Sequence, residues 1–238
     1  MKSTLETIYA DEYLIVVSKP AGLLCIPDRY DPEAPVALEQ LEKEFGRLFV
    51  VHRIDKDTSG LLVYARSAQA HKSLGELFST RAVRKEYLAI VWGRTQEDVW
   101  TCGLSLRADA DRLHRTIVDA RRGKDCFTRF ETAERFREFS LVRALPETGR
   151  THQIRVHLAA SGYPIAADPL YGDGKPVLLS SLKRKWKGDP FDEKPLLART
   201  ALHARRIAFA HPADGRSMAF ELEPPKDFSA LLAQLRKL

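Results

Sequence analysis

Cysteine is scarce in this chain of 238 residues, and no long apolar run is present. The three cysteines are far apart and form no CxxC pair, which argues against a disulfide framework and against a thiolate zinc site. Residues 1–11 contain no apolar run of the kind that begins an export signal. No segment approaches the roughly 20 apolar residues that cross a bilayer. We therefore expect a cytoplasmic protein without a membrane partner.

Acidic residues are fewer than basic ones, with 32 Asp and Glu against 38 Lys and Arg. The formal net charge of +6 favours an anionic partner such as the phosphate backbone of a nucleic acid. Hydrophobic residues make up 44% of the chain, enough for a substantial core. The chain is long enough for one large domain or for two subdomains that share a cleft.

The hydrophobic patterns predict an α+β fold. Strand patterns cover residues 7–9, 13–17, 61–65, 85–92, 126–137, 138–145, 202–209 and 218–222. Helical spacing covers residues 36–45, 69–80, 151–161 and 227–238. Several strands follow one another without an intervening helix, so we expect a mixed, mainly antiparallel central sheet flanked by helices.

Ionisable side chains crowd the loop at residues 52–60, which precedes a hydrophobic strand. They are His52, Arg53, Asp55, Lys56 and Asp57. Loops positioned by rigid strands are where functional residues concentrate. The alternative is an ordinary turn, in which an aspartate caps backbone amides and the charges are solvated.

A second polar segment covers residues 149–157, Gly-Arg-Thr-His-Gln-Ile-Arg-Val-His. A helix here places His152 and Arg155 on one face and Ile154 on the core side. Arg155 is then able to orient a carboxylate from elsewhere in the fold and keep it ionised. The alternative for Arg155 is a surface ion pair, which contributes little to stability.

These segments belong to a longer series of motifs that resembles the RluA family of pseudouridine synthases. The series runs in order through the chain: Lys19-Pro20-Ala21-Gly22, His52-Arg53-Ile54-Asp55 with Thr58-Ser59-Gly60, residues 85–93, residues 149–157, Asp168 with Tyr171-Gly172, Leu202-His203-Ala204, and His211-Pro212. Ile54 and Ala167 stand where the family more commonly has leucine and glycine.

The resemblance implies an isomerisation of uridine in RNA. The bond from C1′ to N1 breaks, the uracil turns, and C1′ rejoins the base at C5, with no cofactor or metal. By similarity Asp55 is the catalytic nucleophile, Arg155 pairs with it, and Tyr87 stacks on the uracil. Attack at C1′, addition to the base and removal of a ribose proton remain open as the action of Asp55.

The resemblance also implies contacts with the extruded nucleotide. Arg53 occupies the gap that the flipped base leaves in the RNA, and Lys19, His52 and His152 bind the substrate. Extrusion is needed because a uracil inside a helix is out of reach of a catalytic group. For Tyr87 the alternative is an ordinary strand aromatic in the core.

Other classes of function fit the sequence less well. His152 and His157 lie five residues apart, whereas a zinc-binding helical pair has a spacing of four, so we expect no metal site and no metal-dependent nuclease. A non-catalytic RNA-binding or ribosome-assembly factor with the same fold is the main alternative. It is disfavoured because the Asp55 motif is intact.

We therefore expect residues 1–238 to form a single pseudouridine synthase catalytic domain without an S4-like domain. Two subdomains are expected to surround a basic catalytic cleft. The expected partner is ribosomal or transfer RNA, with no obligate protein partner and a monomeric state. The basic run at residues 183–187, which encloses Trp186, is either an RNA contact or a solvated loop.

Overall fold

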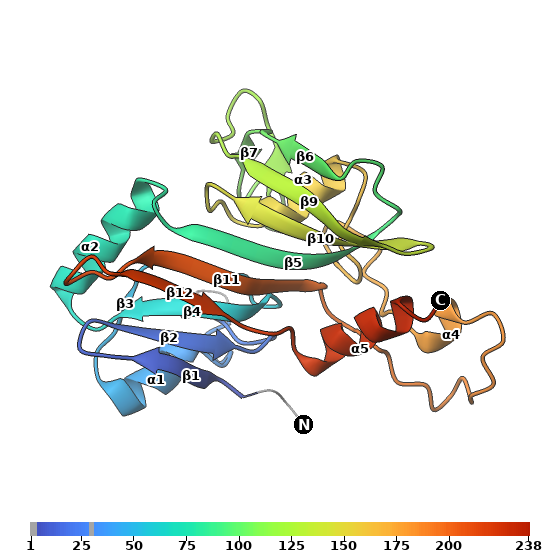
Figure 1. Ribbon diagram of the computed structural model, residues 1–238, viewed down its shortest axis with the longest axis horizontal. Coiled ribbons are helices and arrows are strands. Elements are labelled where there is room, and N and C mark those ends of the chain that lie inside the picture. Colours follow the sequence, from blue (N-terminus) through green and yellow to red (C-terminus); the bar gives the residue numbers. More distant parts are fainter. Residues whose placement is uncertain (1–3, 29–30) are drawn as a thin grey trace. The chain divides into compact units, whose positions relative to one another are not determined.

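The computed structural model describes residues 4–28 and 31–238, so residues 1–3 and 29–30 of the expected domain lie outside the described part. The chain divides into two compact units, coloured by sequence in Figure 1. Unit 1 extends to Glu86 and also includes His203–Glu223. Unit 2 consists of Tyr87–Leu202 and Pro224–Leu238.

Unit 1 is built on a sheet in the order β1 (Glu6–Ala10), β2 (Leu14–Lys19), β4 (Ser59–Ala65) and β11 (Leu202–Ala210). Strand β12 (Ser217–Glu221) pairs with β11, and β3 (Phe49–Val50) pairs with β4. All these pairings are antiparallel except that of β4 with β11. Every residue of β4 is buried, in agreement with the continuous hydrophobic sequence of residues 61–65.

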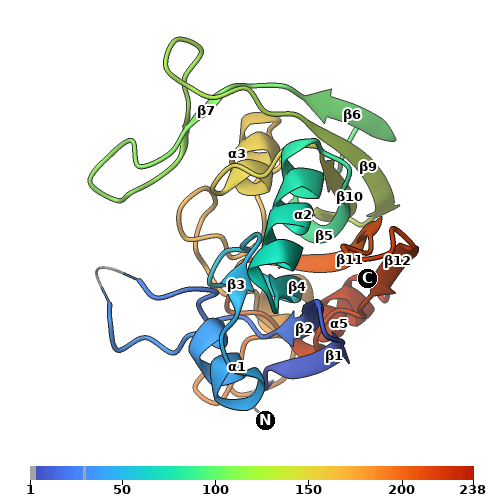
Figure 2. The ribbon, with the colours of Figure 1, turned by 90° about the vertical axis from the view of Figure 1, so that its left-hand side faces the viewer.

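Two helices complete unit 1. Helix α1 (Ala37–Phe45) ends at Gly46, whose φ of +73° suits a residue without a Cβ atom. Helix α2 (Ala68–Ser79) begins where the Ser67 side chain accepts a hydrogen bond from the Ala70 amide at 3.1 Å. Helix α2 packs against β3 and β4, as Figure 2 shows, and adds Ala70 and Leu74 to the core.

Gly60 is required where β4 meets β11. Its φ is +119°, and a Cβ atom there would lie 2.3 Å from the carbonyl oxygen of Ala204. No side chain fits such an approach. The glycine therefore permits the parallel pairing of Ser59 with His203 directly after the Asp55 loop.

Unit 2 is built on a second run of antiparallel strands, in the order β5 (Arg84–Trp92), β10 (Phe139–Pro146), β9 (Thr128–Arg135) and β6 (Val99–Cys102). A separate pair joins β7 (Leu106–Arg107) to β8 (Ile117–Val118). The helices of unit 2 are α3 (Gln153–Ala160), α4 (Leu179–Leu182) and α5 (Lys226–Leu235). Its core includes Ile90, Phe130, Leu158 and Phe228.

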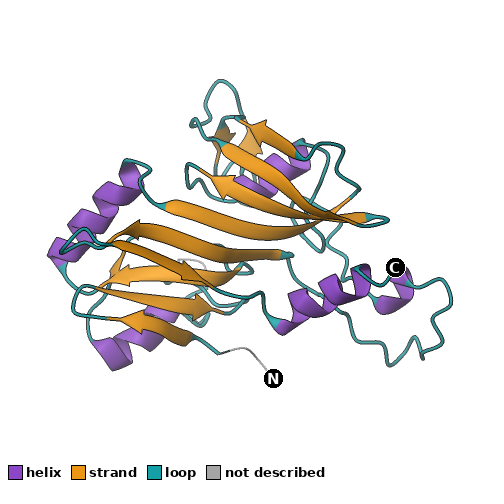
Figure 3. Cartoon of the chain, in the orientation of Figure 1, coloured by secondary structure: helices purple, strands orange, loops and turns teal. Residues whose placement is uncertain are grey.

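The predicted fold class is confirmed: the chain is mixed α+β, with mainly antiparallel strands and few helices, as Figure 3 shows. Each predicted strand and helix has a counterpart at nearly the same residues. The short elements β3, β6 and α4 were not predicted, because two to four residues carry too little periodicity.

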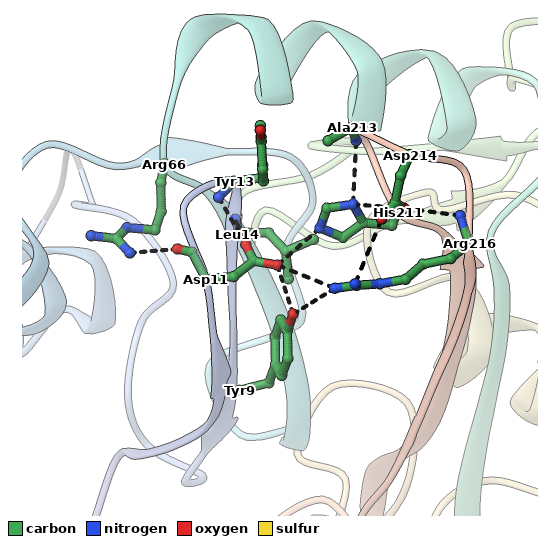
Figure 4. Close-up of polar contacts among 9 residues, drawn as sticks. All are labelled: Tyr9, Asp11, Tyr13, Leu14, Arg66, His211, Ala213, Asp214 and Arg216. Atoms are coloured by element: carbon green, nitrogen blue, oxygen red, sulfur yellow. Dashed lines mark hydrogen bonds and ion pairs between the residues drawn. The ribbon is translucent and has the colours of Figure 1, made fainter.

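Asp11 joins the β1–β2 turn to the β11–β12 turn in unit 1 (Figure 4). One of its carboxylate oxygens accepts hydrogen bonds from the amides of Tyr13 and Leu14 at 2.8 and 2.9 Å. The other accepts from the Tyr9 hydroxyl at 2.7 Å and lies 2.9 Å from Nε2 of the buried His211. Residues two hundred positions apart are thereby held together.

Burial alone raises the pKa of the Asp11 carboxyl group, but these hydrogen bonds outweigh it and lower the pKa from 3.8 to about 2. A carboxyl group with a lowered pKa in the folded state stabilises that state above its unfolded pKa. The stabilisation is lost as the pH falls from about 4 toward 2.

We predict that Asp11→Asn lowers the free energy of unfolding by about 1 to 2 kcal/mol at pH 7, because an amide cannot accept all these hydrogen bonds. Urea titrations at pH 7, 4 and 3 measure the difference in the free energy of unfolding between the wild type and the variant. This difference should become smaller as the pH falls. Asp214→Asn is the control, since that carboxylate also contacts His211, at 3.1 Å, but is half exposed. Equal losses in both variants would contradict a special role for Asp11.

Candidate functional site

The loop that carries Asp55 has a fixed backbone. It connects β3 to β4, and the Thr58 amide donates to the Asp55 carbonyl at 3.1 Å, which closes a tight turn. The Gly22 amide donates to the Lys56 carbonyl at 2.8 Å. Asp55 itself is half-buried, while Ile54 on one side and Thr58 on the other are buried. The half-exposed carboxylate thus sits on an anchored turn.

Lys19 holds this loop from inside unit 1. Its side chain is fully buried at the end of β2, and its ammonium group donates to the carbonyls of Pro20, Leu23 and Lys56 at 2.9, 2.7 and 2.9 Å. An ammonium group has three protons, so these three carbonyls use all of them. The buried ammonium group thus orders the loop, and the expected contact of Lys19 with the substrate stays a prediction.

Cys25 fixes the residue before Asp55. Its thiol donates to the Ile54 carbonyl at 3.1 Å, and its sulfur lies 3.5 Å from the Ile54 amide. The Tyr64 hydroxyl in turn donates to the Cys25 carbonyl at 2.8 Å. Burial raises the pKa of the Cys25 thiol, so it remains a protonated donor. The role of Cys25 could not be predicted from the sequence, because a single cysteine carries no spacing pattern.

His52 fixes the start of the loop. Its Nε2 accepts a hydrogen bond from the Val63 amide of β4 at 3.0 Å, and its ring stacks on Phe78 of α2 at a centroid distance of 4.7 Å. Burial, with a smaller contribution from the charge of Lys85, lowers the pKa of His52 to about 3. The imidazole is therefore neutral near pH 7 and braces the loop. Arg53, the next residue, is exposed.

Strand β5 carries two further polar groups before its buried half. Burial lowers the pKa of Lys85 to about 8. Tyr87 lies two positions on and therefore faces the same side of the strand. Tyr87 is half-buried, pairs with Ala144 of β10 and packs against the core of unit 2.

Arg155 forms a buried two-point ion pair with Asp168. Nε and Nη2 of Arg155 donate to the two carboxylate oxygens of Asp168 at 2.7 and 2.8 Å, and the side chains are 6% and 0% exposed. The amides of Leu170 and Tyr171 also donate to Asp168, at 2.9 and 3.1 Å. The surface ion pair considered for Arg155 is therefore wrong. Asp168 belongs to one of the sequence motifs, but its ion pair with Arg155 was not predicted.

His152 lies before helix α3 and not within it. Its φ of +54° is left-handed, and the helix begins at the next residue, Gln153. The predicted helical face shared by His152 and Arg155 is therefore wrong, although both lie in the same segment. Nδ1 of His152 contacts the Tyr171 hydroxyl at 2.9 Å.

The predicted site residues fall into two groups. Lys19, His52, Arg53 and Asp55 lie in unit 1, where the contacts above organise the Asp55 loop. Tyr87, His152 and Arg155 lie in unit 2. The pairing of Asp55 with Arg155 and the basic cleft around them stay predictions.

No three His, Cys, Asp or Glu side chains among residues 4–28 and 31–238 are grouped so that they could hold a metal ion. In the same residues, no helix is both long and apolar enough to cross a membrane.

The chain is similar in sequence to known proteins along most of its length. Residues 13–160 match the family model described as RNA pseudouridylate synthase. The chain is 37% identical to ribosomal large subunit pseudouridine synthase D of Pseudomonas aeruginosa, over 98% of this chain and 72% of that protein. It is 32% identical to the dual-specificity RNA pseudouridine synthase RluA of Pasteurella multocida, over 92% of this chain and 93% of that protein.

Solved structures show the same fold. Human RNA Pseudouridylate Synthase Domain Containing 1 superposes with a TM-score of 0.70 at 27% identity, covering 94% of this chain and 85% of that one. Human RNA Pseudouridylate Synthase Domain Containing 4 gives a TM-score of 0.72 at 23% identity, covering 97% and 93%.

We predict that Asp168→Asn lowers the free energy of unfolding by about 3 to 5 kcal/mol, because a neutral amide replaces the carboxylate of the buried two-point pair with Arg155. Asp227→Asn is the matched control: Asp227 makes a similar two-point pair with Arg199, at 2.7 and 3.0 Å, but is 38% exposed. Its loss should be about 1 kcal/mol or less. Denaturant titration of both variants measures the difference, and equal losses would argue against a structural role of the buried pair.

Proposed function

Because the chain belongs to the RNA pseudouridylate synthase family and is an isomerase that converts uridine in RNA to pseudouridine, we propose that Asp55 is its catalytic carboxylate. The family resemblance read from the sequence motifs is confirmed by these relatives. The observation that carries the assignment of Asp55 is its position on a turn held by Lys19, Cys25 and His52.

The anchored turn suits each action that a carboxylate can take here. Attack at C1′, addition to the base and removal of a ribose proton all require an ionised carboxylate at a fixed position. The contacts to the backbone at residues 54, 56 and 58 supply that fixed position. The isomerisation changes neither the composition nor the oxidation state of the nucleoside, so it consumes no second substrate.

Three further residues complete the proposed site. Tyr87 stacks on the extruded uracil, a contact typically worth about 1 to 3 kcal/mol. Arg53, which is exposed, occupies the gap left by the flipped base. Arg155 pairs with Asp55 in a basic catalytic cleft, as the family resemblance implies.

Lys19 and His52 position the Asp55 loop in this proposal and also remain proposed substrate contacts. Their polar atoms contact the protein backbone, at three carbonyls and at the Val63 amide respectively. His152 is half-buried and remains a proposed substrate contact. The proposed substrate is a uridine in structured ribosomal or transfer RNA. We propose that the protein acts in the cytoplasm as a monomer and that residues 1–238 form a single catalytic domain.

We predict that Asp55→Asn abolishes catalysis, lowering kcat by about ten-thousandfold or more, because an amide is neither a nucleophile nor a base. Joining C1′ to C5 displaces the C5 hydrogen, so release of tritium from RNA containing [5-³H]uridine measures each turnover. Asp57→Asn is the matched control and should retain activity within about threefold, since Asp57 lies on the same loop but outside the proposed chemistry.

RNA binding by both variants should remain near that of the wild type, which separates catalysis from folding and affinity. Activity of Asp55→Asn near the wild-type level contradicts the assignment. A wild-type protein that binds ribosomal and transfer RNA but releases no tritium from either would favour the non-catalytic alternative.

The basic run that follows α4 is proposed to contact RNA phosphates. Arg184, Lys185 and Lys187 are exposed, and Phe191 nearby is 97% exposed. Trp186 is half-buried and folds back over Gly188, so its ring is a less open stacking surface than the sequence suggested.

We predict that charge reversal of Lys183, Arg184 and Lys185 to Glu weakens RNA binding and flattens its salt dependence. Each lost phosphate contact lowers the slope of log K against log salt by about 0.7 to 0.9. Binding measured from 50 to 300 mM salt gives the slope. An unchanged slope assigns the run to solvent.

A further inference from the structure

The segment at residues 107–124, here called the β7–β8 arm, is ordered by its own charged side chains. Arg107 pairs with Asp119 at 2.8 Å, and Arg115 pairs with Asp111 at 2.7 Å. Asp119 also accepts hydrogen bonds from the amides of Arg121 and Arg122 at 3.0 and 2.9 Å. Figures 1 and 2 show the arm as a loop that projects beyond the other strands of unit 2.

Tyr171 fastens this arm to the body of unit 2. Its hydroxyl oxygen accepts a hydrogen bond from the Thr116 amide at 2.8 Å, directly before β8. Its ring packs in a small apolar cluster with Leu106, Cys126 and Val156. Leu106 directly precedes the arm, in β7, and Val156 belongs to α3, so one side chain connects the base of the arm to the helix that carries Arg155.

The hydroxyl group of Tyr171 has a second partner. Because the Thr116 amide uses the oxygen as an acceptor, the phenol proton is available to Nδ1 of His152 at 2.9 Å. Burial raises the pKa of Tyr171, against smaller opposing effects of the Thr116 amide and Arg155, so the phenol keeps its proton near pH 7. The hydroxyl therefore links the arm to the residue before α3.

The ring and backbone of Tyr171 contact the buried ion pair. The guanidinium carbon of Arg155 lies 5.0 Å from the ring centroid, within the range of a cation–π contact. The amide of Tyr171 donates to the Asp168 carboxylate at 3.1 Å. A change in the position of Tyr171 therefore reaches Arg155 by two routes, through the ring and through Asp168.

We propose that Tyr171 is a positioning residue of the reaction, which couples the attachment of the β7–β8 arm at Thr116 to the orientation of Arg155. This inference rests on the proposed function, because it assumes that the orientation of Arg155 matters for turnover. Tyr171 itself touches no reacting atom in this proposal. Losing its hydroxyl group releases the arm and loosens His152 and the guanidinium together.

Tyr171→Phe tests the proposal because it removes the hydroxyl group and keeps the ring. The Thr116 amide should exchange with deuterium at least about tenfold faster, as expected for a lost hydrogen bond. In the tritium-release assay kcat should fall by about tenfold or more, with a smaller change in KM. The thermal unfolding midpoint should stay close to that of the wild type.

Tyr163→Phe is the matched control. The Tyr163 hydroxyl also accepts a hydrogen bond from a backbone amide of unit 2, that of Gln96 at 3.1 Å, but Tyr163 packs beside Trp100 and Gly93. Neither exchange at Thr116 nor kcat should change in this variant.

Thr116→Pro is a second variant. It removes the backbone amide that donates a hydrogen bond to the Tyr171 hydroxyl group. It should reproduce the loss in kcat, and the double variant with Tyr171→Phe should be no slower than either single variant. If Tyr171→Phe does not fold, Thr116→Pro alone tests whether the attachment of the arm at Thr116 affects kcat.

Each outcome separates this inference from the proposed function. A wild-type protein without activity contradicts the proposed function, whereas an active wild type with an equally active Tyr171→Phe variant contradicts this inference. Unchanged exchange at Thr116 in Tyr171→Phe contradicts the attachment of the arm. Faster exchange with unchanged kcat contradicts the coupling to Arg155.

Discussion

The ammonium group of Lys19 lies out of contact with water, and burying such a charge costs several kcal/mol unless its protons are satisfied. Three backbone carbonyls satisfy them, two beside the lysine and one at Lys56 in the Asp55 loop. If the loop moved, a buried cation would lose a partner, so the loop is confined to one position. The placement of the proposed catalytic carboxylate depends on this contact.

Unit 2 uses a buried cation in a comparable way. Arg155 pairs with Asp168, whose carboxylate also accepts the amides of Leu170 and Tyr171 and so fixes the turn that follows. Each unit therefore contains a buried basic side chain that orders a segment next to a proposed functional residue. Such pairs add little net stability compared with apolar packing, but losing one partner is costly, which favours a single arrangement.

The sequence predicted the long elements because their patterns are local. Residues 61–65 of β4 form a continuous apolar run, and α1 ends at a glycine with a left-handed φ. The side-chain partners were harder to predict. Lys19 reaches a carbonyl 37 positions away, and Arg155 pairs with an aspartate 13 positions away. Spacing along the chain does not encode such contacts. Spacing alone also placed His152 and Arg155 on one helical face, whereas the left-handed backbone of His152 places it before the helix.

The central claim is that Asp55 enables this chain to form pseudouridine in the RNA of its host. The most direct measurement maps pseudouridines in ribosomal and transfer RNA from a strain without the gene, and again after the wild-type or the Asp55→Asn gene is returned. We predict that at least one pseudouridine disappears on deletion and reappears only with the wild-type gene. Unchanged pseudouridines after deletion, or restoration by the Asp55→Asn gene, would contradict the account.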